Sequence, residues 1–406
     1  MGREPAVTWN PYTAGYFDNP YEHLRQCREE NPVHKGVHGA WVIFKYEDCY
    51  NALRTPDAQV SELSEYFREK EPAIFKGSGC PYLSKGTSKW AMYLNGDEHK
   101  QVRKVMVKAF KQFDLATILT EAVAEVNSLF ANKQEFDLVD YCSRFIYLVI
   151  KRLYSFPDDF GFEEIREYSN MVARSQDLFV PRQVYQSIND WFLKGNELFN
   201  ELSVIADPSG YKAQLISLGR ETGVEYSEED ILSILSVSVM AAFETSKDSL
   251  SMALLEVLES PAKIEEIEKA SPAQLAVCIE ELFRFTSPLQ YTVRITGSDL
   301  QLVDTMIPAG SKVFLCLASA NRDPLMFERP DELQLSRTVN NHLAFGAGSH
   351  ACAGTHIARQ EMKYCLKPIV EFLKDYQVCN RSEVKYAKQI MMRTIESVWL
   401  KKRTIA

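Results

Sequence analysis

The sequence lacks several features that would assign it to common protein classes. No C-x-x-C pair occurs among its nine cysteines, so zinc ribbons, thioredoxin-type redox centres and covalent c-type haem attachment have no signature. The odd number of cysteines, at irregular intervals, favours reduced thiols over a disulfide framework. No internal repeat, low-complexity tract or long Gly/Ser linker divides the 406 residues, so we expect a single domain over 1–406.

Signals for export and for membrane insertion are also missing. Residues 1–26 carry charged side chains and no apolar core of the kind that a secretory signal needs. The longest apolar run, 231–243, is interrupted by three serines and is shorter than the about 20 residues of a membrane span. The formal net charge of -9 argues against nonspecific nucleic-acid binding. These features predict a cytoplasmic protein with no membrane and no nucleic-acid partner.

The distribution of residue types predicts a mainly α protein with a small β region. Stretches rich in β-branched and aromatic residues lie in 36–60 and 286–320, where we expect short strands at 41–44, 292–295 and 312–315. Most of the remainder, from about 98 to 284, has apolar residues at three- and four-residue spacing, which is typical of helices. Strands and helices do not alternate, so a doubly wound sheet is not expected.

Two predicted helices matter most for function. The first begins near Ser227, where Ser227-x-x-Asp230 is a variant of the capping box, and continues to Leu258. Its middle is so apolar that it should run through the core. The second begins just after Cys352 and continues toward Phe372.

The segment from His342 to Gly354 has the strongest functional pattern. Gly346 and Gly348 allow a tight turn, and Gly354 allows another group to approach the backbone closely. Cys352 is then at the start of a helix, where unpaired N–H groups and the helix dipole favour a thiolate. A thiolate in this position is a strong donor to haem iron.

Two other interpretations of this segment remain. A lone cysteine beside alanines is more often a small core residue. The segment also contains Gly346-x-Gly348-x-x-Ala351, which matches a dinucleotide-binding fingerprint. A Rossmann loop should follow a hydrophobic strand and open a βαβ unit, and neither is expected here, so we interpret this match as accidental.

The string Phe345-x-x-Gly348-x-x-x-Cys352-x-Gly354 resembles the haem-binding signature of the cytochrome P450 family. The resemblance implies the cytochrome P450 fold and haem b, with Cys352 as the axial ligand of the iron. Other cofactor contacts that it implies are Phe345, Gly346, Gly354 and Ala241. It also implies a monooxygenase that takes dioxygen and external electrons.

Upstream, Glu281-Leu-Phe-Arg284 is similar to the family's E-x-x-R helix, and the resemblance adds Arg337 as a third member of a structural core cluster. Residues three apart share a helix face, so an ion pair can form locally. A solvated pair on the surface is the more ordinary interpretation of such a tetrapeptide.

The segment from Ala241 to Thr245 resembles the part of the family's central helix that binds oxygen. The resemblance implies that Thr245 hydrogen-bonds the oxygen and that Glu244 relays protons. An acid and a hydroxyl in an apolar helix are costly to bury without partners or a task, unless this helix face reaches solvent. The family often has Gly where this chain has Ala242, and the added methyl group would narrow the oxygen groove.

Four basic side chains match the family's contacts to the haem propionates: His99, Arg103, Arg294 and His350. His99 and Arg103 are four residues apart, so they share one helix face and can donate to one carboxylate.

The chain has no flavin or iron–sulfur motif, so a separate ferredoxin or flavodoxin is implied as its redox partner. We expect the protein itself to be a monomer. Lys100, Lys104, Lys108 and Lys111 recur at helical spacing, either as an ordinary solvated face or as the docking site of this acidic partner.

By resemblance, the substrate pocket would draw on residues 75–93, 179–185, 289–292 and 390–392 and on the central helix. The predicted pocket residues are Met240, Phe243, Leu289, Tyr291, Thr292, Phe179 and Met391. They predict a hydrophobic small-molecule substrate that is hydroxylated or epoxidised in biosynthetic or secondary metabolism. A peroxide-driven or non-oxygenating enzyme of this fold, and a noncatalytic haem-binding protein, are the alternatives.

Overall fold

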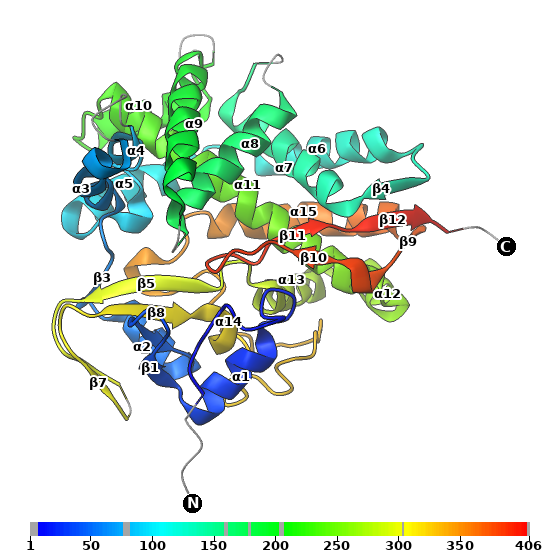
Figure 1. The fold of residues 1–406 in the computed structure, drawn as a ribbon. Helices are drawn as coiled ribbons and strands as arrows, with labels where there is room; N and C mark the ends of the chain where they lie inside the picture. The colour runs from blue at the N-terminus through cyan, green and yellow to red at the C-terminus, as the bar shows by residue number, and fades with distance from the viewer. Residues whose placement is uncertain are drawn as a thin grey trace, which may run out of the picture.

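The computed structural model describes residues 7–75, 82–157, 161–177, 180–202, 207–302 and 304–403. The described chain is mainly helical with small sheets, as the sequence predicts (Figure 1). The helices are α1 (Tyr21–Glu30), α2 (Tyr46–Arg54), α3 (Leu63–Phe75), α4 (Leu83–Gly86), α5 (Gly96–Phe110), α6 (Leu115–Phe130), α7 (Leu138–Tyr154), α8 (Phe162–Ala173), α9 (Arg182–Asn200), α10 (Tyr211–Glu221), α11 (Glu228–Leu258), α12 (Pro261–Lys269), α13 (Pro272–Thr286), α14 (Leu317–Ala320) and α15 (Thr355–Leu373).

The strands are short and fall mostly near the two ends of the chain. They are β1 (Val33–Lys35), β2 (Trp41–Ile43), β3 (Ala58–Gln59), β4 (Glu135–Asp137), β5 (Tyr291–Thr296), β6 (Leu300–Gln301), β7 (Met306–Ile307), β8 (Lys312–Cys316), β9 (Tyr376–Val378), β10 (Lys385–Tyr386), β11 (Ile395–Ser397) and β12 (Trp399–Lys402). The strands expected at 41–44, 292–295 and 312–315 are confirmed as β2, β5 and β8.

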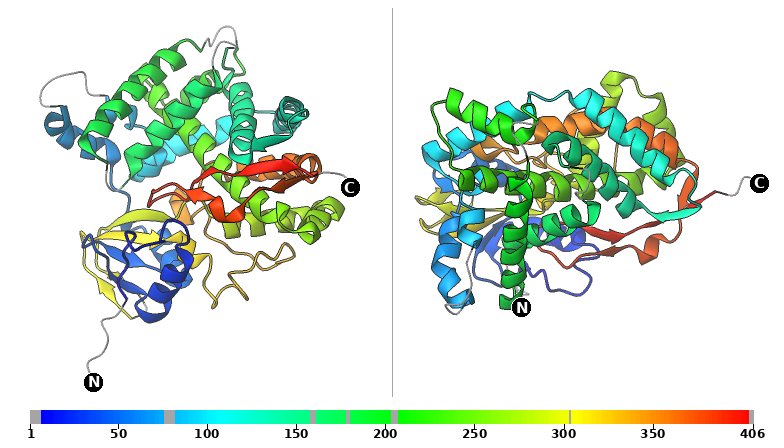
Figure 2. Two further views of the ribbon diagram at one scale, coloured as in Figure 1. Left: turned by 45° about the vertical axis from the view of Figure 1, so that its right-hand side comes forward. Right: turned by 90° about the horizontal axis from the view of Figure 1, so that it is seen from above.

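The largest sheet joins the two predicted β stretches in the order β1-β2-β8-β5-β3. Strand β2 pairs in parallel with β8, with Val42 opposite Phe314, and β5 pairs antiparallel with β8, with Arg294 opposite Val313. This sheet, with α1 and α2 beside it, lies at one side of the molecule, while the long helices form the rest (Figures 1 and 2). Helix α2 lies within 36–60, where the sequence predicted only strands.

Helix α11 runs through the middle of the helical region, as predicted (Figure 1). It begins with the expected capping box, because Ser227 Oγ accepts from the Asp230 N–H at 3.2 Å and the Asp230 carboxylate accepts from the Ser227 N–H at 3.0 Å. It packs against α7, α8 and α13 and is buried along most of its length, as its apolar sequence requires. Across the described ranges, we find no helix that is both long and apolar enough for a membrane span.

Candidate functional site

One cavity lies where α5, α7, α11, α15 and β5 meet the loop that carries Cys352. Its walls are mostly apolar, and they bring together segments that are far apart in the sequence. The predicted site residues that line it are Cys352, His99, Arg103, Arg294, His350, Phe345, Gly346, Gly354, Ala241, Thr245, Leu289, Tyr291, Thr292 and Met391. These residues come from motifs spread along the chain, and the structure brings them to one cavity.

The loop before α15 holds Cys352 against this cavity. Gly346 and Gly348 have positive φ angles of 65° and 72°, so both occupy the left-handed region that favours glycine. A Cβ atom on Gly348 would also lie 2.5 Å from the backbone oxygen of Leu53. The Cys352 N–H donates to the Phe345 oxygen at 2.8 Å, which closes the loop. These contacts explain why two glycines precede the cysteine.

Two opposing effects act on the pKa of Cys352. Desolvation in the cavity wall raises the pKa of the thiol, whereas the backbone N–H of Gly354, the Thr355 hydroxyl and the Arg103 charge lower it. The donors at the start of α15 thus favour the thiolate, and a metal ion bound to the sulfur would favour it further.

The four predicted basic residues converge on the same cavity. His99 and Arg103 come from α5, Arg294 from β5, and His350 from the loop before Cys352. The rings of His99 and His350 stack with their centroids 4.0 Å apart. Within the described part of the chain, His99 Nε2 and His350 Nδ1 are buried without a hydrogen-bond partner. Buried imidazole nitrogens without a protein partner indicate a ligand, and the two guanidinium groups beside them favour an anionic one.

Burial depresses the pKa values of all four groups, and repulsion from nearby cations adds to this at the two histidines. Desolvation lowers the pKa of His99, Arg103 and Arg294, the last to about 10. The pKa of His350 falls to about 3, because burial acts first and the charges of His99, Arg294 and Arg103 add to it. A ligand with two carboxylates would relieve this repulsion, and the propionates of haem have that charge.

On α11, only one face of the predicted oxygen-binding segment lines the cavity. Ala241, Ala242 and Thr245 are on this face, and the Thr245 hydroxyl donates to the Ala241 oxygen at 2.6 Å. Ala242, where the family often has Gly, is thus part of the cavity wall.

Glu244, which was predicted to relay protons, is not among the residues that line the cavity. Its carboxylate accepts from Lys247 Nζ at 2.8 Å in a buried cluster in which Lys247 also lies 3.4 Å from Asp248. Asp248 in turn accepts from the Thr394 hydroxyl at 2.7 Å. At 3.6 residues per turn, Glu244 is rotated by about 100° around the helix axis from Thr245.

The same helical geometry corrects two predicted pocket residues. Met240 and Phe243 are buried on other faces of α11 and do not line the cavity, although Met240 Sδ accepts from Gln176 Nε2 at 3.5 Å. Tyr291 lines it, but its hydroxyl lies 2.6 Å from that of Tyr16. Phe179 lies outside the described residues.

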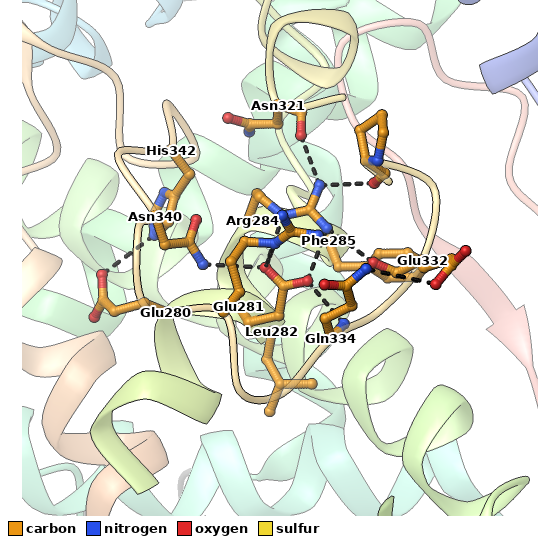
Figure 3. Close-up of polar contacts among 12 residues, drawn as sticks. Glu280, Glu281, Leu282, Arg284, Phe285, Asn321, Glu332, Gln334, Asn340 and His342 are labelled. Carbon is orange, nitrogen blue, oxygen red and sulfur yellow. Dashed lines mark hydrogen bonds and ion pairs between the residues drawn. The ribbon is translucent and has the colours of Figure 1, made fainter. Parts of the chain in front are cut away.

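Figure 3 shows the predicted structural cluster around Glu281 and Arg284, with Asn340 and His342 beside it. The Glu281 carboxylate accepts from Arg284 Nε at 2.7 Å and from Arg337 Nε at 3.0 Å, and the side chains of Glu281 and Arg284 are fully buried. It also accepts from Asn340 Nδ2 at 3.1 Å. The structure thus brings these three charged residues together in the interior, and the surface-pair interpretation does not hold.

Several polar residues line the cavity without having been predicted from the sequence. Among them are Gln176, Asp177 and Glu361. Glu361, on α15, accepts from the Ser246 hydroxyl at 2.9 Å, and burial raises its pKa to about 7. No motif pointed to these residues, because their position depends on how helices far apart in the sequence pack together.

Comparisons with known proteins agree with this geometry. The family model described as "Cytochrome P450" matches residues 209–391. The chain is 24% identical to the biotin biosynthesis cytochrome P450 of Bacillus subtilis, over 94% of this chain and 96% of that protein. It is 26% identical to the epothilone C/D epoxidase of Sorangium cellulosum, over 90% of this chain and 88% of that protein.

Solved structures show the same fold. P450BioI, in complex with an acyl carrier protein ligated to hexadec-9Z-enoic acid, has a TM-score of 0.84 at 20% identity, covering 96% of this chain and 100% of that one. Epothilone D-bound cytochrome P450epoK also has a TM-score of 0.84, at 22% identity, covering 98% and 100%.

The cavity fits the cofactor of this family, because unpaired basic donors for two carboxylates and a cysteine sulfur surround one apolar space. The family model and these relatives together indicate a cytochrome P450 monooxygenase whose cofactor is haem b, with dioxygen and electrons from an external redox partner as co-reactants.

Proposed function

We propose that Cys352 is the axial ligand of the haem iron and that the protein inserts one oxygen atom into a hydrophobic small molecule, by hydroxylation or epoxidation. The single observation that carries the proposal is the arrangement of the Cys352 sulfur and four convergent basic side chains around one apolar cavity. Relatives named for polyketide and epothilone chemistry favour a role in biosynthetic or secondary metabolism.

Each of the four basic residues would bind the haem propionates. His99 and His350 would donate through the nitrogen atoms that are now unpaired, and Arg103 and Arg294 would supply positive charge. Phe345, Gly346, Gly354 and Ala241 would pack against the haem.

Haem with a thiolate ligand supplies the activation of dioxygen. Thr245 would hold a proton at the cavity wall, since its hydroxyl donates to Ala241 and leaves its oxygen lone pairs available as acceptors. The apolar walls would exclude bulk water and hold the substrate.

The absorption spectrum of the reduced, carbon-monoxide-bound protein tests the ligand assignment. We expect a strongly red-shifted Soret band that vanishes in Cys352→Ala, and a haem-loaded Cys352→His variant without the red shift. Cys379, which is exposed and remote from the cavity, provides the control, so Cys379→Ala should keep the band. An unchanged band in both Cys352 variants would contradict the proposal.

The role of Thr245 is tested by coupling of electron use to product. Thr245→Ala should raise peroxide release relative to product, whereas Thr245→Ser keeps the hydroxyl and should stay near wild type. Undiminished coupling in Thr245→Ala would favour a peroxide-driven enzyme. Normal haem spectra without turnover of any substrate would favour a noncatalytic haem-binding protein.

We further propose that a ferredoxin or flavodoxin docks on the outer face of α5. Lys100, Lys104 and Lys108 are exposed there, with Lys111 just beyond its end, while His99 and Arg103 of the same helix face the cavity. A negatively charged partner would be attracted to this face. Neutralising Lys104 and Lys108 to Gln should slow reduction by the partner and weaken its salt dependence.

The control for this docking surface is the pair Lys401 and Lys402, which is exposed on β12. Their substitution by Gln changes the net charge equally and should leave the reduction rate unchanged. Equal effects of the two double variants would show that α5 is an ordinary solvated face.

A further inference from the structure

One part of the cavity wall is polar, although most of the wall is apolar. Tyr93, Gln176 and Asp177 line this part, the last two at the end of the short 3₁₀ helix η2 (Arg174–Gln176) that follows α8. The Tyr93 hydroxyl donates to Gln176 Oε1 at 3.1 Å, and Gln176 Nε2 donates to Met240 Sδ at 3.5 Å. The Gln176 amide is therefore engaged through both of its polar atoms, and Asp177 is left as the acceptor.

The Asp177 carboxylate is partly buried and lines the cavity. Among the described residues, no hydrogen bond or ion pair reaches its side chain, and its backbone N–H donates to the Arg174 oxygen at 3.1 Å. Burial raises the pKa of this carboxyl to about 6, against the opposite effect of the Arg174 charge. At neutral pH the group is thus mostly ionised.

An ionised carboxylate in an apolar wall is costly unless a donor satisfies it. A carboxylate only accepts hydrogen bonds, so its ligand must donate, and charge-assisted bonds are roughly twice as strong as neutral ones. The cations that line the cavity, Arg103 and Arg294, belong to the proposed propionate site, so neither is assigned to Asp177.

We propose that the substrate is a hydrophobic molecule that carries a protonated amine, and that Asp177 binds this ammonium group inside the cavity. The inference rests on the proposed function, since it places the substrate in the cavity beside the haem. Asp177 is then a specificity-determining residue that favours cationic over neutral substrates and disfavours carboxylates.

Binding of three probes with one apolar chain tests this charge preference. N,N-dimethyldodecylamine is protonated at neutral pH, 1-dodecanol is a neutral donor, and dodecanoic acid is an anion. Equilibrium dialysis with the haem-loaded protein, below micelle-forming concentrations, gives each dissociation constant without relying on turnover. We expect the wild type to bind the amine about tenfold more tightly than the alcohol, as a charged hydrogen bond predicts, and the acid most weakly.

The variant Asp177→Asn should abolish the preference for the amine. Its dissociation constant for the alcohol should stay within about threefold of wild type, a smaller change than the tenfold one that corresponds to about 1.4 kcal/mol. Asp190→Asn is the matched control, because Asp190 is an exposed acid on α9 and its loss changes the net charge equally. An amine preference that persists in Asp177→Asn would overturn the inference. So would equal binding of amine and alcohol by the wild type, or no measurable binding of the amine.

Failure of this inference is distinguishable from failure of the proposed function. A red-shifted Soret band that depends on Cys352, together with no amine preference, would refute only the role of Asp177. A Soret band that is not red-shifted, or that does not depend on Cys352, would refute the proposed function. Dialysis would still report whether Asp177 selects a cation.

Discussion

Replacing Glu281 by Gln should destabilise the protein severely. The substitution keeps the shape of the side chain but removes the charge that Arg284 and Arg337 share, at N–O distances of 2.7 and 3.0 Å. Glu281 and Arg284 are fully buried and Arg337 is 6% exposed, so water cannot replace the lost partner. Breaking a buried pair of this kind costs about 3–5 kcal/mol, because uncompensated charge remains in the interior.

The side-chain amide of the Glu281→Gln variant would also place two N–H donors among neighbours that are all donors to the Glu281 carboxylate. Glu281 accepts from Asn340 Nδ2 at 3.1 Å and from the backbone N–H of Gln334 at 2.9 Å, in addition to the two guanidinium groups (Figure 3). One amide oxygen cannot serve all of these donors. We therefore expect the loss to lie toward the upper part of that range.

Urea unfolding of the haem-loaded protein at fixed protein concentration measures the effect as a shift of the midpoint at constant slope. Glu265→Gln is the control, because Glu265 and its partner Lys269 are 61% and 74% exposed, so their ion pair contributes little to stability. If Glu281→Gln costs no more than Glu265→Gln, the reasoning about uncompensated burial is refuted.

Two other changes probe the loop and its support. Burial acts to raise the pKa of Glu280, but hydrogen bonds from Arg359 and His342 and the Arg359 charge outweigh it and lower this pKa to about 2, below its ordinary 4.5. A depressed folded-state pKa contributes stability above pH 4.5 that is lost as the pH falls toward 2, so acid titration of stability should flatten in Glu280→Gln over this window. Gly348→Ala should cost about 1–3 kcal/mol, because it combines a positive φ with a clash at Leu53, and should lower haem retention measured by the Soret absorbance. Gly346→Ala has a positive φ but no close contact, so an equal loss there would show that the clash is unimportant.

Features that depend on local sequence were predictable. The capping box at Ser227, the long apolar run after it and the β-branched strands each report their own structure through periodicity and end signals. The glycines around Cys352 likewise identified a tight loop. The match between four separated motifs then predicted one common site.

Features that depend on side-chain direction were not predictable. Glu244 is adjacent to Thr245 in the sequence but does not line the cavity. Met240 and Phe243 were likewise assigned to the cavity because they lie beside the motif in the sequence, and they do not line it either. Asp177 and Glu361 face the cavity only because of how η2 and α15 pack against α11. Residues that are neighbours in a sequence motif can thus have side chains that point in different directions from a helix.

The thiol of Cys352 illustrates a further gap. Sequence position at a helix start predicts donors that lower the pKa, and the structure adds desolvation at the wall of an apolar cavity, which raises it. The balance between desolvation and hydrogen bonding depends on three-dimensional surroundings, which a motif does not report.

The segment that ends at Thr394, whose hydroxyl donates to Asp248, has a consequence for how the protein folds during synthesis. Residues 391 and 392 form part of the cavity wall, and the next residue, Arg393, donates to the backbone oxygens of Phe17 and Asp18 at 3.2 and 2.9 Å. A chain still being synthesised on the ribosome therefore lacks part of the cavity wall until residue 394 has emerged. It also lacks the hydrogen bonds from Arg393 to the backbone of Phe17 and Asp18. Haem capture in this final geometry consequently has to wait for residues well beyond the Cys352 loop itself.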